Sequence, residues 1–369
     1  MILIYLLFLY HFILQYKNRC AIILIENLID NESHSYLERV VNNNDDKERI
    51  NIMKLRYLVI SLIVLSIASL FLGVANISPM DIFSMTEEQR EVMLVSRLPR
   101  LISILIAGAS MSIAGLIMQQ LSKNKFVSPT TAGTLDAARV GVLVSLMLFT
   151  TASPLVKISI SFGFALIGTF IFMKLLENIK FKDPVFIPLV GLMFGSIISS
   201  LGTFFAYKND LIQNMTSFMQ GDFSMVMTGN YELLYISIPT LIIGYIYANK
   251  FTIAGMGEEF SKNLGLNYRQ VVNIGLVLSA LITSSVVLSV GVIPFLGLII
   301  PNIVTIYQGD HLKNNILHTA LLGAGFVLVC DMIGRIIIYP YEIPINLTVG
   351  VIGSGIFIYL LLRRKRYGL

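Results

Sequence analysis

The stretch RLPRLISILIAGASMSIAGLIMQQL, Arg97–Leu121, decides how this chain folds. The run after its second arginine carries no charge and has the length, about 20 residues, that a helix needs to cross a bilayer. Gly108, Ser112 and Gly115 lie three or four residues apart within it. Small residues at that spacing let helix backbones approach closely. The stretch therefore predicts a tightly packed transmembrane helix.

The composition extends this prediction to the whole chain. Of 369 residues, 55% are hydrophobic and only 13% are charged, whereas a soluble domain carries about 25% charged residues. The sequence therefore predicts an all-α polytopic membrane protein that is surrounded by membrane lipid. The net charge of +5 is interpreted as a signal of orientation in the membrane, and no nucleic-acid partner is expected.

About ten transmembrane helices are expected after Met53. The apolar segments are long enough, or nearly long enough, to span a bilayer. They lie at 57–75, 98–121, 134–151, 155–176, 185–207, 232–249, 270–290, 293–307, 314–338 and 344–362. The segment at 293–307 is short and contains Pro294 and Pro301. It is predicted to be a half-span or a broken helix, which is tolerated where protein or a cavity surrounds it.

Residues 1–52 differ from the rest. The opening apolar run is short for a span and lacks the basic start and the cleavage site of a signal peptide. Met53-Lys54-Leu55-Arg56 then leads into a clean apolar run. We expect Met53 to be the native start, with 1–52 a doubtful leader and 53–369 the transmembrane domain. A genuine extra anchor at 1–52 is the alternative.

Lys and Arg residues predict the orientation. With Met53 inside and the spans alternating, most of the cations after Met53 fall in inner loops, as the positive-inside rule requires. Both termini and the polar stretch 255–267 are then cytoplasmic, and the protein belongs in the plasma membrane. The inner set comprises Lys54, Arg56, Lys123, Lys125, Lys174, Lys180, Lys182, Lys250, Lys262, Arg269, Lys313, Arg363, Arg364, Lys365 and Arg366.

The stretch GMGEEFSKNLGLN at 255–267 is a polar island between two apolar spans. Glu258 and Glu259 in a first turn would suit the positive end of a helix. Gly265 stands where a glycine in the left-handed conformation commonly ends a helix. The pattern predicts a helix of about two turns near 257–267.

Phe260 and Leu264 would share one face of that helix because they are four residues apart. So short a helix is marginal alone in water. An apolar face at the membrane surface therefore suggests a docking partner, and an ordinary polar loop is the alternative.

Three arginines are predicted near the outer ends of two spans. Arg97 and Arg100 flank the start of one helix, where a cation opposes the helix dipole and the positive-inside rule. Docking to an acidic partner would explain them, and snorkelling to lipid phosphates is the alternative. Asp331 and Arg335 are four apart and could form a neutralised pair within a span.

Motifs for several other functions are missing from the sequence. It contains no G-x-x-x-x-G-K-[ST] loop for ATP, no Ser-His-Asp or H-E-x-x-H arrangement, and no ligand spacing among its four histidines and two cysteines. The sequence therefore gives little support for an enzyme, and no cofactor or metal is expected. A secondary transporter driven by an ion gradient stays as an alternative, although successive spans lack the buried acids it would use.

Four stretches resemble the motifs of FecCD-type permeases, the membrane subunits of iron-siderophore and vitamin B12 ABC importers. RLPRLISILIAGASMSIAGLIMQQLSKNKFVSPTTAGT resembles the arginine-leucine-proline-arginine helix and the loop after it. GEEFSKNLGLN resembles the coupling-helix loop, GVIPFLGLIIPNIVTI a glycine-rich short segment, and DMIGRIIIYPYEIPINLTVGVIGSGIFIYLL the closing pair of helices. The resemblance runs from Met53 to the C-terminus, with Asn302 where the family often has histidine.

This resemblance implies the type II ABC importer permease fold and a set of partners. These are a separate ATP-binding subunit that hydrolyses ATP, an extracellular lipoprotein that delivers the substrate, and a second permease as an identical or sister subunit. The binding protein would dock through its glutamates on Arg97, Arg100 and Arg335. The ATPase would couple through Glu258, Glu259, Phe260, Lys262, Leu264, Gly265 and Leu266. Reversing the charges of Arg97 and Arg100 is expected to weaken docking and leave folding intact.

The resemblance also suggests a substrate. NKFVSPTTAGTLDAARVG and FIPLVGLM are similar to Gram-positive permeases for iron(III)-catecholate siderophores of the petrobactin type. Import of an iron(III)-siderophore is therefore expected, and haem or vitamin B12 are the alternatives within the family.

Overall fold

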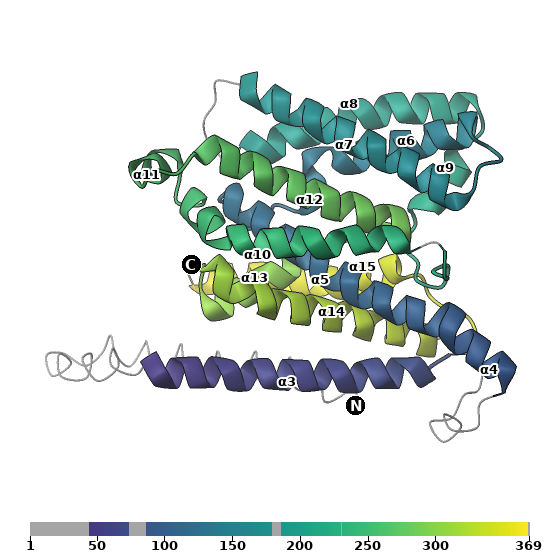
Figure 1. Cartoon of the computed structure of the whole chain (residues 1–369), viewed down its shortest axis with the longest axis horizontal. Helices are drawn as coiled ribbons and strands as arrows, with labels where there is room; N and C mark the ends of the chain where they lie inside the picture. Colours follow the sequence, from purple (N-terminus) through teal and green to yellow (C-terminus); the bar gives the residue numbers. More distant parts are fainter. Residues whose placement is uncertain (1–43, 74–85, 179–185, 230, 368–369) are drawn as a thin grey trace, which may run out of the picture. The chain divides into compact units, whose positions relative to one another are not determined.

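The computed structural model describes residues 44–73, 86–178, 186–229 and 231–367, in which every regular element is helical (Figure 1). The helices are α3 Asn44–Phe71, α4 Glu87–Val92, the π-helical η2 Met93–Arg97, α5 Leu98–Leu121, the 3-10 helix η3 Pro129–Ala132, α6 Thr134–Leu148, α7 Pro154–Asn178, α8 Phe186–Lys208, α9 Ile212–Met219, the 3-10 helix η4 Glu232–Ile236, α10 Ser237–Ala254, α11 Glu258–Asn263, α12 Tyr268–Val290, α13 Leu296–Gln308, α14 Leu312–Ile336 and α15 Ile345–Tyr367.

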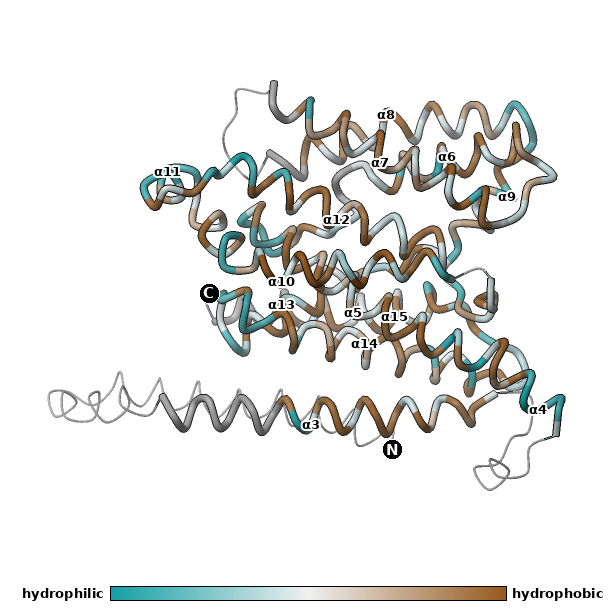
Figure 2. The backbone as a smooth tube through the Cα atoms, in the orientation of Figure 1, coloured by the Kyte–Doolittle hydropathy of each residue, from teal (hydrophilic) through white to brown (hydrophobic). Residues whose placement is uncertain are grey.

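The predicted all-α fold is confirmed, because a helix lies in each of the ten predicted segments. Five helical stretches of the described chain are long and apolar enough to cross a membrane on their own. They are Glu87–Leu121, Leu155–Leu175, Leu189–Lys208, Tyr268–Val290 and Leu312–Ile336. Leu55–Phe71, Leu296–Gln308 and Ile345–Leu360 are shorter apolar helices. Figure 2 shows the apolar character of the long helices and the polar character of α4, α11 and many turns.

Residues 66–369 form one packed unit, separate from residues 1–65, and the remaining description concerns this unit. Within it α5 lies at the centre and packs against α10, α12, α13 and α14 (Figure 1). A second group consists of α6, α7 and α8, and α12 joins the two groups by packing against both α5 and α7. The core of the unit is therefore built around α5, the helix predicted from the stretch Arg97–Leu121.

The small residues of α5 bring it close to two neighbours. A Cβ added to Gly108 would lie only 2.8 Å from the backbone of Ala324 in α14. A Cβ on Gly115 would overlap the backbone of Gly297 in α13. Both positions therefore need glycine, and the sequence prediction of close helix packing is confirmed for α5.

Helix α13 is a half-span, as its prolines predicted. It has 13 residues, which gives a length of about 20 Å, less than the roughly 30 Å of a bilayer core. Pro301 lies inside it and cannot donate a hydrogen bond to the carbonyl of Gly297, four residues earlier. The Gln119 side chain supplies donors there instead, with Nε2 3.5 Å from the Gly297 oxygen and 3.1 Å from the Leu298 oxygen.

Asn302 completes the support of this broken segment. Its Nδ2 donates to the Leu298 oxygen at 2.8 Å and to the Lys125 oxygen at 2.7 Å. The asparagine that replaces the family's frequent histidine thus ties α13 to the loop after α5. Irregular backbone inside a membrane protein is stable when side chains satisfy its polar groups in this way.

The unit has two distinct ends. Helix α11 projects beyond the ends of α10 and α12, while α4 lies at the opposite end (Figure 1). We call these the α11 end and the α4 end. The arginines predicted to lie outside belong to the segments next to α4, and the predicted coupling helix is α11 itself. The two candidate sites therefore lie at opposite ends of the helices.

Candidate functional site

At the α4 end the structure brings the three predicted arginines together with two carboxylates. We call this group, Arg97, Arg100, Arg335, Asp331 and Glu342, the arginine cluster. Arg97 ends the π-helical turn η2, and the next residue begins α5. Asp331 and Arg335 come from the last turns of α14, and Glu342 from the connection to α15. Residues far apart in the sequence thus meet at one site.

Asp331 binds two of the arginines at once. Its Oδ1 accepts hydrogen bonds from Arg100 Nε at 3.2 Å and Arg100 Nη2 at 2.7 Å. Its Oδ2 accepts from Arg335 Nη2. The third arm of Arg100, Nη1, donates to Glu342 Oε2 at 2.7 Å. The guanidinium of Arg100 is therefore fully engaged by carboxylates of its own chain, in the geometry that charged hydrogen bonds favour.

The other two arginines hold the end of α3. Arg335 Nη1 donates to the carbonyl oxygens of Ser69 and Leu72 at 3.1 and 3.0 Å, and Nη2 donates to Ser69 Oγ at 2.7 Å. Arg97 Nη1 donates to the Leu70 oxygen at 2.5 Å. Cations at a helix C-terminus satisfy its last carbonyls and suit its dipole. Two of the predicted docking arginines thus also have a structural task.

Burial changes one expectation about these residues. Arg97 and Arg335 are each 7% exposed, and the Arg100 side chain is 12% exposed. Reversing a buried, paired charge leaves its partners uncompensated, which is strongly destabilising. In contrast to the expectation from the sequence that folding stays intact, reversal of the charges of Arg97 and Arg100 is therefore expected to destabilise the fold. The alternative of a neutralised pair between Asp331 and Arg335 fits the geometry.

At the α11 end the predicted short helix is confirmed as Glu258–Asn263. Gly265 has φ +74°, the left-handed conformation expected of a glycine that ends a helix. Leu266 N donates to the Ser261 oxygen and Gly265 N to the Lys262 oxygen, both at 2.9 Å. These two bonds form a Schellman motif, which fixes the end of the helix.

Helix α11 is attached by its inner side. Ser261 is fully buried, and its Oγ donates to the carbonyl oxygens of Gly257 and Ile253 at 2.6 and 3.0 Å. Leu266 packs against the hydrophobic core formed by α5, α10 and α12. Leu266 therefore attaches the segment to the core. Its role differs from that of the other predicted coupling residues, which are expected to contact the ATPase.

The outer side of α11 presents apolar side chains. Phe260 is 48% exposed and Leu264 58% exposed, which agrees with the predicted contact face. Met256, which the sequence prediction missed, is 55% exposed just before the helix. Met256 precedes Gly257, which caps α11 with φ +118°, so it lies outside the helix and the spacing rule for helix faces could not reveal it. Glu258 and Lys262 form an ion pair of 2.7 Å beside this face.

Lys123 connects α11 to the end of α5. Its Nζ donates to the Met256 oxygen at 2.9 Å, and a Cβ on Gly257 would lie 2.6 Å from the same Nζ. A Cβ on Gly255 would likewise lie very close to the side chain of Gln120, in the last turn of α5. A movement of α11 would therefore reach the central helix directly. Sequence reasoning counted Lys123 only as an orientation signal.

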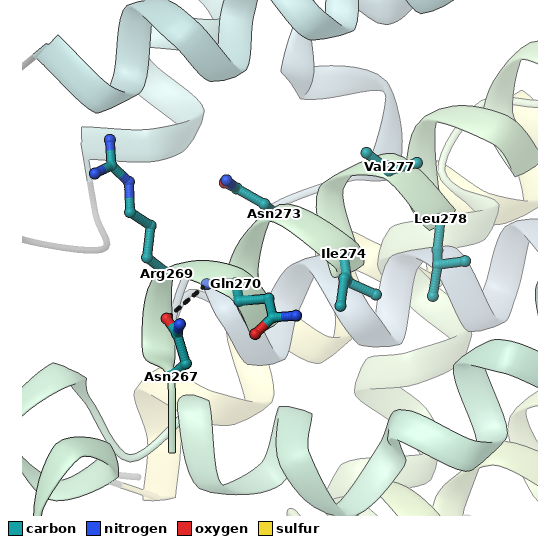
Figure 3. Close-up of a pocket in the computed structure, with 7 residues that line it drawn as sticks. All are labelled: Asn267, Arg269, Gln270, Asn273, Ile274, Val277 and Leu278. Atoms are coloured by element: carbon teal, nitrogen blue, oxygen red, sulfur yellow. Dashed lines mark hydrogen bonds between the residues drawn. The ribbon is translucent and has the colours of Figure 1, made fainter. Parts of the chain in front are cut away.

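A groove of about 550 Å³ runs along the start of α12 (Figure 3). The described residues that line it belong to α12 or to its cap, and the Asn267 side chain accepts a hydrogen bond from Gln270 N at 3.2 Å. The lining comprises Asn267, Arg269, Gln270, Asn273, Ile274, Val277 and Leu278. The sequence prediction assigned no role to this groove.

The fold and these sites define a membrane-embedded permease, and the chain belongs to the FecCD transport family, whose match covers residues 61–363. The protein is accordingly a transport subunit and not an enzyme. The match begins after Met53, and the prediction for residues 1–52 stays a prediction, since residues 1–43 lie outside the described chain.

Individual relatives are similar over most of their length. The petrobactin import system permease protein YclN of Bacillus subtilis is 66% identical over 315 residues, which cover 85% of this chain and all of the relative. The ferric-anguibactin permease FatD of Vibrio anguillarum is 35% identical over 83% of this chain and 98% of its own. The petrobactin permease FatD of Bacillus anthracis is 35% identical over 84% of this chain and 90% of its own.

A solved structure shares the fold. It is described as an inward-facing conformation of a metal-chelate type ABC transporter, and it aligns with a TM-score of 0.73. The alignment covers 84% of this chain and 99% of that chain at 22% identity. The arrangement of helices is therefore that of an ABC importer permease, as the resemblance implied.

Proposed function

We propose that this protein is the permease subunit of an ATP-driven importer that carries an iron(III)-siderophore of the catecholate type into the cytoplasm. The observation that carries this proposal is the identity of 66% to a petrobactin import permease over that protein's whole length. Two further relatives are named for iron-siderophores, petrobactin and ferric-anguibactin. No relative cited above is named for haem or vitamin B12.

Coupling to a separate ATPase is assigned to α11. Its exposed Phe260 and Leu264 form an apolar face at a polar end of the molecule. Such a face is costly in water and gains free energy when a partner covers it. The attachment through Ser261 and Lys123 would carry a push from the ATPase into α10 and α5. That push would switch the permease between its outward- and inward-facing states.

Docking of the substrate-binding lipoprotein is assigned to the arginine cluster. Arg97, Arg100 and Arg335 lie together there beside the carboxylates of Asp331 and Glu342, and such a group of arginines would attract acidic residues of a partner. Both chain termini and α11 would then be cytoplasmic and the cluster extracellular. A second permease, as an identical or a sister subunit, would complete the transport path.

The test of this function is uptake by proteoliposomes that contain the permease, its candidate ATPase and the binding protein. We expect uptake of iron(III)-petrobactin that requires ATP inside and persists when ion gradients are collapsed. Uptake that follows an ion gradient and ignores ATP would overturn the proposal in favour of a secondary transporter. Preference for haem or vitamin B12 would overturn the substrate alone.

A variant of α11 tests the coupling. Leu264→Asp places a charge on the apolar contact face, and we expect ATP-driven uptake to fall at least tenfold because about 1.4 kcal/mol of lost contact suffices. Asn263→Asp adds the same charge one residue earlier, on an exposed amide position. We expect this control to transport normally. Equal effects of the two substitutions would show that charge near the membrane, and not the apolar face, matters.

A further inference from the structure

The loop that follows the central helix α5, residues 122–128, begins with a strained turn. Lys123 N donates to the Gln120 oxygen at 3.4 Å and Asn124 N to the Gln119 oxygen at 3.2 Å, so α5 ends in a Schellman motif. The left-handed residue of this motif is usually glycine, because a side chain is strained there. Here it is Lys123, with φ +49°. Strained residues of this kind cluster at functional sites.

The side chain of Lys123 makes a contact that glycine could not make. Its Nζ donates to the Met256 oxygen at 2.9 Å, and Met256 directly precedes the glycine that caps α11. A glycine in place of Lys123 would relax the turn and lose this contact. The turn therefore carries the residue that links α5 to α11 instead of the residue that suits its backbone best.

Two residues further along, the same loop is attached to α13 and to the turn after it. Lys125 Nζ forms an ion pair with Asp310, which lies between α13 and α14. The Lys125 oxygen accepts a hydrogen bond from Asn302 Nδ2 of α13 at 2.7 Å. Asn124 Oδ1 accepts from Phe126 N at 2.9 Å, and this Asx turn stiffens the backbone around Lys125.

Aromatic rings extend the attachment to the start of α13. The ring of Phe126 packs edge-on against Phe357 of α15 at 6.0 Å, and Phe357 stacks on Phe295 at 6.4 Å. Phe295 immediately precedes α13 and has φ +60°. The loop therefore contacts the middle of the half-span α13 directly, its end through Asp310 and its start through Phe357.

The ion pair between Lys125 and Asp310 contributes little to stability. Its side chains are 34% and 69% exposed, and the attraction of such surface charges is weakened by water. A cavity of about 520 Å³ lies beside the pair, and Lys123, Lys125, Asp310 and His311 are among its lining residues. The pair thus costs little to displace, and the cavity leaves room for the loop to move.

We propose that the loop 122–128 carries the movement of α11 to the half-span α13, with Lys123 and Lys125 as its two positioning residues. A push from the ATPase on α11 displaces the Met256 oxygen, and Lys123 transfers this displacement to the loop. Lys125 passes it on to α13 through Asp310 and Asn302. Helix α13 is then the element that shifts between the outward- and inward-facing states. This inference rests on the proposed coupling of α11 to an ATPase.

Lys123→Gly tests the first link. Glycine suits the left-handed turn, so the unfolding temperature of the variant should stay the same or rise. The number of substrate molecules taken up per ATP hydrolysed, measured in proteoliposomes with the ATPase and the binding protein, should still fall at least about fivefold, the low end of the usual coupling between two sites. A wild-type ratio in this variant would overturn the proposal.

Exchange of the charges of Lys125 and Asp310 tests the second link. Lys125→Asp and Asp310→Lys should each lower the uptake per ATP, because like charges then face each other. The double exchange should recover most of the ratio, because the pair forms again in reverse. Lys313→Asp is the matched control, since the Lys313 ammonium lies over the Tyr245 ring of α10 instead. An equal loss in Lys313→Asp, or no recovery in the double exchange, would contradict the second link.

Hydrogen exchange separates this inference from the proposed substrate. With the ATPase trapped on ATP by orthovanadate and no siderophore present, the backbone amides of residues 302–312 should change their exchange rate in the wild type and not in Lys123→Gly. A wild type that shows this response but takes up no siderophore would refute the substrate and support the inference. No response in the wild type, or the same response in Lys123→Gly, would overturn the inference.

Discussion

Removing the carboxylate of Asp331 tests the arginine cluster most directly. Asp331→Asn keeps the size of the side chain but takes away the charge that faces Arg100 and Arg335. Both of these ion pairs are buried, with Asp331 3% exposed and its two partners 12% and 5% exposed. Two cations would then remain close together, with Glu342 as the one carboxylate of the cluster beside them.

The expected cost follows from this burial. Breaking a buried ion pair by removing one partner typically costs about 3–5 kcal/mol, since the remaining charge stays desolvated. The screening that weakens surface pairs does not apply here. At about 2 °C per kcal/mol for a chain of this size, the unfolding temperature should fall by roughly 6–10 °C.

Thermal unfolding of the purified protein in one detergent measures this effect. Glu258→Gln provides a control, as its ion pair with Lys262 lies at the surface and should change stability by less than about 1 kcal/mol. An Asp331→Asn protein that unfolds within 2 °C of the wild type would refute the reasoning.

Three further substitutions test neighbouring features. Glu342→Gln should strengthen docking of the acidic binding protein and steepen its salt dependence, because the cluster gains net positive charge; weaker docking would contradict the proposed role. Gly115→Ala should lower the free energy of unfolding by about 1–3 kcal/mol, because the added methyl group forces α5 and α13 apart. Gly163→Ala is the control, since its Cβ would lie in open space, and it should be neutral or stabilise the protein by up to about 1 kcal/mol. Gln119→Leu should lower stability by about 1–3 kcal/mol, since the Gly297 carbonyl that Pro301 leaves unpaired loses its side-chain donor. Unchanged unfolding would show that another group supports the break.

Much of the fold could be predicted from local patterns. Apolar run length located the ten helices, and the short run with its two prolines predicted a half-span or a broken helix where α13 lies. The acids and Gly265 correctly bounded α11, because capping and helix dipoles depend on residues close in sequence. Each of these features depends on residues that lie within one helix or next to its ends, so the sequence alone shows them.

The state of the arginines could not be predicted in the same way. Arg100 and Glu342 are far apart in sequence, and only the packing of α5 against α14 brings their charges together. The pair between Asp331 and Arg335 was visible because its partners lie on one helix. Similarly, Lys123 donates to the backbone carbonyl of Met256. Every residue has such a carbonyl, so the sequence does not show which residue accepts the bond.

The manner in which α11 is attached has a consequence for how such importers diversify. Its fixing contacts from Ser261 and Lys123 end on main-chain oxygens of Ile253, Gly257 and Met256. Main-chain acceptors persist when side chains are exchanged. The outward residues of α11 can therefore be substituted to fit a different ATPase while the contacts that attach the helix stay the same. Exchange of ATPases between related importers should then require changes at a few exposed positions rather than a new helix.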